Sequence, residues 1–116
     1  KVIGMDAIDL FIDRAKQLAT CFGVKRVLFV RGDFLKASFP EATVLYLFGS
    51  QLQDEEIVQF ITNIRRQKLQ VNVITISYCL GDYVENKESC YEFIKEFEVA
   101  FPWGKTTCYI QRFNGS

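Results

Sequence analysis

Two apolar segments near the start of the chain each lead into a carboxylate, and a helix-patterned segment lies between them. The first is Val2–Asp6, and the second runs from Val27 to Val30 and is followed by Asp33. From Ile8 to Phe22 the apolar residues recur at three- and four-residue steps, with Gly23 where a helix C-cap belongs. Parallel strands need such a crossover, so this opening predicts a β-α-β unit. The carboxyl ends of its strands are where α/β folds bind nucleosides.

The middle of the chain repeats this order. Ala42 to Phe48 is again a run of strand-forming apolar residues, as expected for a parallel strand covered on both faces. Asp54 begins the next helix, because carboxylates accept hydrogen bonds from the first free amides and suit the helix dipole. The apolar face of that helix extends to Ile64, and Val71 to Tyr78 is the following strand. The pattern predicts a second β-α-β unit.

The last third of the chain departs from this rhythm. A polar stretch from Gly81 to Ser89 is predicted to be a flexible loop. Tyr91 to Phe101 mixes apolar and charged residues and is predicted to end in a strand around Phe97 to Phe101. Pro102-Trp103-Gly104 is typical of a turn, and Thr106 to Phe113 alternates weakly as a last strand. The expected fold class is therefore α/β, a mostly parallel sheet with a C-terminal antiparallel hairpin.

Length and composition limit the function classes. A chain of 116 residues with 49% hydrophobic residues is long enough for one domain, and no apolar run approaches the ~20 residues of a membrane span. Lys plus Arg and Asp plus Glu both number 14, so no basic excess favours a nucleic acid as the primary partner. We expect a cytoplasmic protein, with residues 1–116 as one domain and no membrane association.

The chemistry-bearing side chains exclude further classes. The four cysteines are scattered and are predicted to be buried thiols, without a metal site: Cys21, Cys79, Cys90 and Cys108. The chain has no histidine, which removes the usual general base and the usual partner of a nucleophilic serine or cysteine. Any reaction here must need little acid or base catalysis.

Four short blocks carry a resemblance to a known family. They are Gly4-Met5-Asp6, Arg31 to Leu35, Ala42 to Leu47, and Phe101 to Lys105. In their order and spacing they resemble the Rossmann-like, seven-stranded methyltransferases that use S-adenosylmethionine (AdoMet), from the second strand of that fold onward. Within this superfamily the Gly-Asp-Phe-Leu, Ala-Thr-Val and Trp-Gly-Lys stretches are similar to the histone-lysine methyltransferases that lack a SET domain and to their bacterial relatives.

The resemblance implies a cofactor site at the carboxyl ends of the first two strands. Asp6 matches the acid that accepts hydrogen bonds from the two ribose hydroxyls, and Asp33 matches the carboxylate that binds the adenine amine. Phe34 matches the aromatic residue that packs on the base, and Gly32 would let the backbone approach it. Purely structural roles remain open as alternatives to these binding roles. Asp6 could be a turn residue or helix cap, Phe34 a core residue, and Trp103 an anchor of the hairpin.

The substrate side of the resemblance is less complete. In this family the segment after the fourth strand faces the methyl acceptor, and here it includes Phe48, Gly49 and Ser50, with Trp103 as a further candidate. The segment lacks both the Asn/Asp-Pro-Pro-aromatic signature of amine methyltransferases and the Asn of the non-SET lysine enzymes. The resemblance therefore leaves two acceptors open, a protein lysine and a small molecule.

The family's first strand and its Gly-rich turn have no counterpart in this sequence. That strand would lie centrally, between the strand ending at Asp6 and the strand from Ala42 to Phe48. We expect the chain to be a fragment, or a domain that takes the missing strand from a partner chain in a homodimer or strand-swapped assembly.

Three functions remain open on the sequence. The first is an AdoMet-dependent methyltransferase domain, inactive as this piece alone; methyl transfer suits a chain without histidine because orientation supplies much of the catalysis. The second is a dinucleotide-binding domain of an NAD or FAD enzyme, which the terminal hairpin disfavours. The third is a noncatalytic interaction module that kept the fold and lost the site.

Overall fold

The computed structural model describes residues 2–39, 41–48, 52–84 and 90–115. Its internal contacts divide the chain into two compact units, Lys1–Ala37 and Ser38–Ser116, which are described separately below. Most of the loop predicted at Gly81–Ser89 lies outside the described residues, and the described part begins with a short 3-10 turn, η1, Leu80–Tyr83.

The first unit is the predicted β-α-β unit. Strand β1 (Val2–Asp6) leads into helix α1 (Asp9–Cys21), and strand β2 (Val27–Arg31) returns parallel to β1, in register from Val2↔Val27 to Asp6↔Arg31. Helix α1 ends as the sequence predicts, because Gly23 adopts a φ of 66°, which a residue without a Cβ accepts at little cost. The unit thereby places the ends of β1 and β2 side by side.

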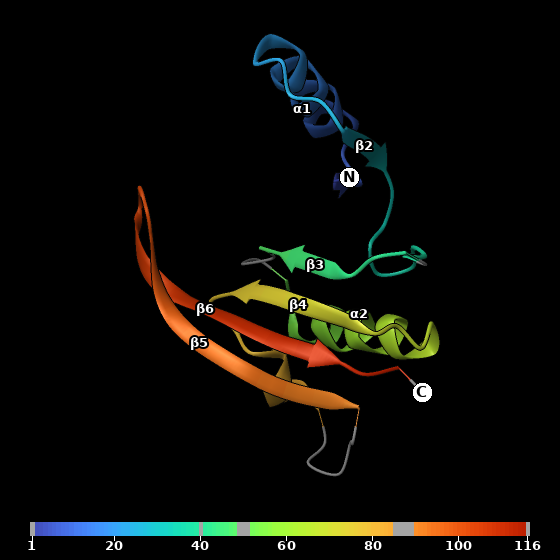
Figure 1. Cartoon of the computed structure of the whole chain (residues 1–116), viewed down its shortest axis with the longest axis vertical. Helices are drawn as coiled ribbons and strands as arrows, with labels where there is room; N and C mark the ends of the chain where they lie inside the picture. Colours follow the sequence, from blue (N-terminus) through green and yellow to red (C-terminus); the bar gives the residue numbers. More distant parts are fainter. Residues whose placement is uncertain (1, 40, 49–51, 85–89, 116) are drawn as a thin grey trace. The chain divides into compact units, whose positions relative to one another are not determined.

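The second unit is a four-stranded sheet with one α-helix. Its strands lie in the order β3-β4-β6-β5; β3 pairs parallel with β4, and both pairs that involve β6 are antiparallel (Figure 1). Its elements are β3 (Val44–Leu47), α2 (Asp54–Arg66), β4 (Val71–Ile76), β5 (Tyr91–Phe101) and β6 (Gly104–Phe113).

Helix α2 begins where its acidic residues predict, but its cap is the residue before them. The side chain of Gln53 accepts from the backbone of Glu56, and the Glu56 side chain accepts from the Gln53 amide at 3.1 Å, which forms a capping box. The apolar face of α2 is buried against the sheet, on the side where residues of β4 are also buried. The buried residues are Ile57, Phe60, Ile61 and Ile64 on α2 and Val71 and Val73 on β4. This layer is the core of the second unit.

Strand β5 is longer than the sequence predicts. It pairs with β6 from Tyr91↔Phe113 to Phe101↔Gly104, with an irregularity between Phe93 and Lys95. One extra residue at such a bulge reverses the inward–outward alternation, which hides a long strand from a period-two pattern. The strand predicted only around Phe97 therefore starts at Tyr91.

The predicted single sheet is matched in part. The two parallel pairs and the C-terminal hairpin are present. Over the described residues, however, the strands form two sheets, β1-β2 and β3-β4-β6-β5, with no hydrogen-bonded pair that joins them. The sequence-based expectation placed the break at the same point, between the strand that ends at Asp6 and the strand that ends near Phe48.

A buried glutamine fastens the turn after β4 to the sheet. Gln111 on β6 is fully buried, and its oxygen accepts from the Leu80 amide at 3.0 Å and from the Tyr91 hydroxyl at 3.2 Å. Its amide donates to the Val73 carbonyl and to the Thr75 hydroxyl, both at 3.1 Å. Such a satisfied polar network fixes one arrangement of the elements that it joins.

Replacement of Gln111 tests this role. In Gln111→Leu the Leu80 amide loses its partner inside the protein, and we expect the free energy of unfolding to fall by about 2–3 kcal/mol, since an unsatisfied buried group costs about 1–3 kcal/mol. Denaturant unfolding followed by circular dichroism measures the loss. Gln59→Leu, at an exposed position of α2, is the matched control and should change stability little; equal losses in both variants would contradict the assignment.

Tyr78, in the same turn, has a buried hydroxyl without a hydrogen-bond partner among the described residues. Burial, with a smaller contribution from Tyr83, raises the pKa of Tyr78 from 10.0 to about 12. The unfolded chain therefore loses this proton at lower pH than the folded chain. Ionisation of Tyr78 therefore costs no stability below pH 10.0 and lowers the free energy of unfolding as the pH rises from 10.0 to about 12.

We expect Tyr78→Phe to reduce the alkaline loss of stability. At neutral pH the variant should be as stable as the parent or more so, because it removes a buried hydroxyl that lacks a partner. Unfolding curves recorded between pH 8 and 12 measure the slope, with Tyr46→Phe, at an exposed position of β3, as the control. An unchanged slope in Tyr78→Phe would show that the hydroxyl titrates in water.

Candidate functional site

The carboxyl ends of β1 and β2 meet at one edge of the first unit. Asp6, the last residue of β1, lies beside Arg31 in the parallel register. The next residue along β2, Gly32, donates its amide to the Asp6 carbonyl at 3.0 Å. The structure therefore brings Asp6, Gly32 and the start of the Asp33 turn to one place, as the sequence predicts.

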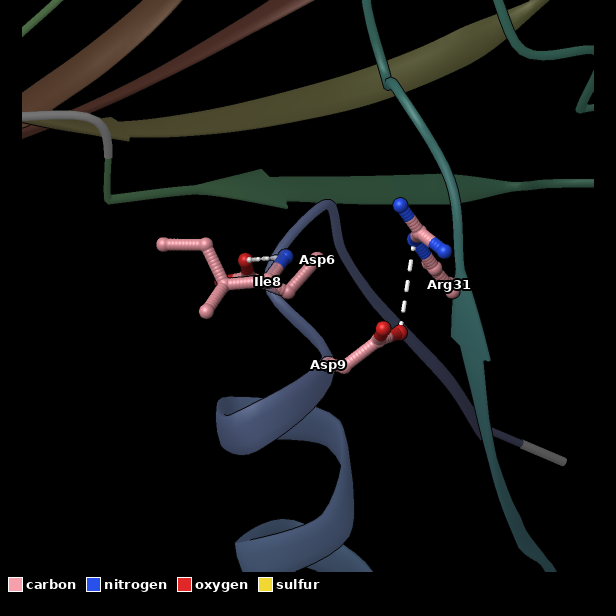
Figure 2. A network of polar contacts seen from close by, with 4 residues as sticks. All are labelled: Asp6, Ile8, Asp9 and Arg31. Atoms are coloured by element: carbon pink, nitrogen blue, oxygen red, sulfur yellow. Dashed lines mark hydrogen bonds and ion pairs between the residues drawn. The ribbon is translucent and has the colours of Figure 1, made fainter.

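The Asp6 carboxylate is held by its own turn. Its Oδ1 accepts from the Ile8 amide at 2.9 Å, while the neighbouring Arg31 guanidinium points to Asp9, with a Nε–Oδ1 distance of 3.3 Å (Figure 2). That ion pair is exposed, with about two thirds of each side chain accessible, so it contributes little stability. A carboxylate offers about four acceptor positions, and one backbone bond leaves Asp6 able to accept from a ligand.

Asp33 has a similar local role. Its Oδ1 accepts from the Leu35 amide at 3.0 Å, and its carbonyl accepts from Lys36 and Ala37 at 3.0 and 2.8 Å. The side chain is exposed, and Phe34 beside it is half-buried. Both acids thus act as turn residues in the structure, and each carboxylate keeps acceptor positions beyond its one turn hydrogen bond.

Two glycines in this unit have different surroundings. A Cβ on Gly32 would meet the flexible Met5 side chain, with its sulfur at 3.2 Å, whereas a Cβ on Gly4 would meet the Phe29 ring at 2.8 Å. Phe29 is the register partner of Gly4, so the ring lies across the glycine. Packing is therefore a sufficient reason for a glycine at position 4, and a weaker reason for a glycine at position 32.

The substrate-side candidates gather at the hairpin of the second unit. Phe48, directly after β3, packs roughly perpendicular to Phe101 and Trp103, with centroid distances of 5.6 and 6.1 Å and interplanar angles of 84° and 88°. Phe101 and Trp103 are stacked at 4.9 Å and 8°. Gly49 and Ser50, the other two candidates, lie outside the described residues. Phe101 was not singled out by the sequence, although it opens the Phe-Pro-Trp-Gly-Lys block.

The cysteines follow the prediction only in part. Cys108 is buried and Cys79 and Cys90 are half-buried, but Cys21 is exposed at the end of α1, a helix in which Ile12 is the one buried residue. Throughout the described ranges the cysteines are free, and no three acidic or sulfur ligands lie close enough to hold a metal ion.

Comparison with solved structures shows the fold. TrmN from Thermus thermophilus is 12% identical, with a TM-score of 0.69 over 96% of this chain. A tRNA (uracil-54, C5)-methyltransferase from Pyrococcus abyssi, in complex with S-adenosyl-L-homocysteine, is 12% identical, with a TM-score of 0.64 over 97% of the chain. Magnesium protoporphyrin IX methyltransferase from Synechocystis, with the same compound bound, is 10% identical, with a TM-score of 0.69 over 97%.

The chain has the fold of AdoMet-dependent methyltransferases. At these identities the likeness concerns the fold alone, and the chain spans 36%, 28% and 64% of the lengths of the three proteins. A scan against protein-family models gives no match, and neither does a search of the curated proteins. The finer resemblance to lysine methyltransferases without a SET domain is not confirmed.

These findings bear on two expectations from the sequence, the exclusion of nucleic acid as the primary partner and the lack of a membrane-spanning segment. Proteins with this methyltransferase fold include RNA methyltransferases, so the zero net charge does not support the exclusion of nucleic acid. In the part of the chain that the structure describes, no helix is both long and apolar enough to cross a membrane.

The glycine surroundings give a test that needs no ligand. Gly4→Ala should lower the free energy of unfolding by about 1–3 kcal/mol, because the Phe29 ring must leave its position. Gly32→Ala should cost less, since the end of the Met5 side chain can move by a few tenths of an ångström. Thermal unfolding followed by circular dichroism compares the two variants, and a larger loss in Gly32→Ala would contradict the packing described here.

Proposed function

We propose that residues 1–116 are one partial domain of a cytoplasmic AdoMet-dependent methyltransferase, not active as this piece alone. The observation that carries the proposal is the fold, which aligns with methyltransferases over 96–98% of the chain. The order of its strands, with antiparallel β6 beside β4, counts against a dinucleotide-binding domain, because the sheets of those domains usually end in parallel strands.

The residues at the ends of β1 and β2 suit the adenosine part of AdoMet. Asp6 would accept hydrogen bonds from the ribose diol, and Asp33 would accept one from the adenine amine, because ionised carboxylates are acceptors only. Phe34 would pack on the base, and Gly32 would allow its close approach. When bound, AdoMet supplies a methyl group that its sulfonium already activates. The work left to the protein is to orient the acceptor and exclude water.

The acceptor is proposed to approach the second unit near Phe48 and Trp103, with Gly49 and Ser50 between β3 and α2 as further candidates. A small molecule and a protein lysine are the two acceptors that we propose. The aromatic cluster that the hairpin turn and the end of β3 form together supports this placement of the acceptor.

We also propose that one further parallel strand, with a Gly-rich turn for the methionine part of AdoMet, completes the sheet. Over the described residues β1 has β2 as its one paired neighbour and β3 has β4, so each has an edge that could pair with such a strand. The strand would come from a longer form of this polypeptide or from a second copy in a homodimer or strand-swapped assembly.

Calorimetric titration with S-adenosylhomocysteine and with NAD tests the proposed cofactor. We expect a form of the chain extended at its N-terminus to bind S-adenosylhomocysteine and not NAD, and the 116-residue chain to bind it more weakly. Preference for NAD would favour a dinucleotide-binding domain. Binding of neither compound by the extended form would favour a noncatalytic module.

Asp6→Ala in the extended form tests the ribose contact. We expect binding of S-adenosylhomocysteine to weaken by about 1.5–3 kcal/mol, the range for hydrogen bonds to a charged group. Asp13→Ala removes the same charge from an exposed position of α1 and is the control. If both variants bind like the parent, Asp6 is a turn residue only.

A further inference from the structure

Asp6 has a cation as its direct neighbour on the adjacent strand. It is the register partner of Arg31, and neighbouring strands of a sheet lie about 4.8 Å apart, with the side chains of paired residues on the same face. The long arginine side chain reaches a carboxylate at this spacing, and the guanidinium group binds carboxylates strongly, often through two hydrogen bonds. The register of β1 and β2 alone would therefore favour an ion pair between Asp6 and Arg31.

The structure shows a different pairing. The Nε of Arg31 lies 3.3 Å from Oδ1 of Asp9, three residues beyond Asp6. Figure 2 shows the guanidinium on the side of Asp9, while the Asp6 carboxylate accepts from the Ile8 amide at 2.9 Å. Asp9 thus takes the cation that the strand register places beside Asp6.

The start of α1 determines where Asp9 stands. Asp9 is the first residue of the helix, and the Asp6–Ile8 hydrogen bond closes the turn that leads into it. The amides of Phe11 and Ile12 both donate to the Ile8 carbonyl, at 3.1 and 3.2 Å, which fixes the first helical turn. An acid is also favoured in the first turn by the helix dipole. The backbone therefore holds the Asp9 carboxylate within reach of β2.

An ion pair between Arg31 and Asp6 would compete with a ribose diol. Both the diol and a guanidinium donate hydrogen bonds to the same carboxylate oxygens, and the Ile8 amide already uses one acceptor position of Asp6. The Arg31–Asp9 pair is exposed, so it contributes little to stability. Its effect is instead on the direction of the cation, which it turns away from Asp6.

We infer that Asp9 is a positioning residue of the candidate cofactor site, which pairs with Arg31 and so keeps the Asp6 carboxylate open to the ribose diol of AdoMet. The part of this inference that concerns the ligand rests on the proposed function. The part that concerns which acid Arg31 approaches does not.

The direction of Arg31 can be measured without a ligand, in the chain of 116 residues. In isotopically labelled protein, we expect the nuclear Overhauser effect between Hε of Arg31 and the β protons of Asp6 to be weak in the parent and strong in Asp9→Ala. Asp13→Ala removes the same charge from an exposed position of α1 and should leave the parent pattern unchanged. An Arg31 side chain that stays away from Asp6 in Asp9→Ala would overturn the inference.

Calorimetric titration of the extended form with S-adenosylhomocysteine measures the consequence for binding. We expect Asp9→Ala to bind about two- to fivefold more weakly than the parent, because the ligand must displace an exposed ion pair. Salt screens such a pair, so the difference should shrink as the ionic strength rises.

A second substitution separates this role from a purely structural one. Asp9→Ala/Arg31→Gln should regain the affinity of the parent, since the cation that competes for Asp6 is gone. Damage to the start of α1 would not be reversed by the loss of Arg31. If Arg31→Gln alone weakens binding as much as Asp9→Ala and the double variant does not recover, Arg31 contacts the ligand itself and the inference is wrong.

The inference and the proposed function fail separately. If the extended parent does not bind S-adenosylhomocysteine, the proposed function fails, and the nuclear Overhauser effects still decide which acid Arg31 approaches. If the parent binds and Asp9→Ala binds equally well, the inference about Asp9 fails and the methyltransferase proposal stands.

Discussion

Pairing of strand edges is the constraint on which the rest of this structure depends. Strand β4 has a paired neighbour on both sides and one side covered by α2, and its Val71, Val73 and Thr75 are completely buried. Strands β1 and β3 have one described neighbour each, and Val2 and Tyr46 on them are 62% and 60% exposed. Backbone amides and carbonyls on an unpaired edge must find other partners. The candidate cofactor residues stand at the end of one such strand, so pairing of that strand also decides how firmly they are held.

Local signals in the sequence predict the element ends well and the long strand poorly. Gly23 ends α1 because a residue without a Cβ adopts the left-handed conformation at little cost, and acidic residues mark the start of α2 because they suit free amides. These effects act within a few residues. Strand β5 depends instead on β6, whose paired residues lie twelve or more positions away along the first half of β5, and the bulge between Phe93 and Lys95 breaks the alternation that would reveal it. Its first half could be recognised only from its partner.

In the candidate site, too, some features follow from the local sequence and others depend on residues that the sequence alone does not bring together. Asp6 and Asp33 could be placed together from the sequence, because parallel strands joined by one helix end at the same edge. The sequence could not show that each carboxylate also binds an amide of its own turn, or that Arg31 points to Asp9 and not to Asp6. It also missed Phe101, which joins the aromatic cluster only because the two-residue turn folds Trp103 back onto it.

The two outer strands of the four-stranded sheet differ in how they meet solvent. Strand β5 carries Lys95, Glu96 and Glu98 and a bulge, devices by which natural edge strands avoid pairing with other chains. Two copies of β5 related by a two-fold axis would also bring Glu96 opposite itself or another acid in the central registers, at an electrostatic cost. Strand β3, Val-Leu-Tyr-Leu, has no charge and no bulge along its described length. An incoming strand would therefore meet resistance at β5 and none at β3, which is the edge where the proposed completion of the sheet requires it to pair.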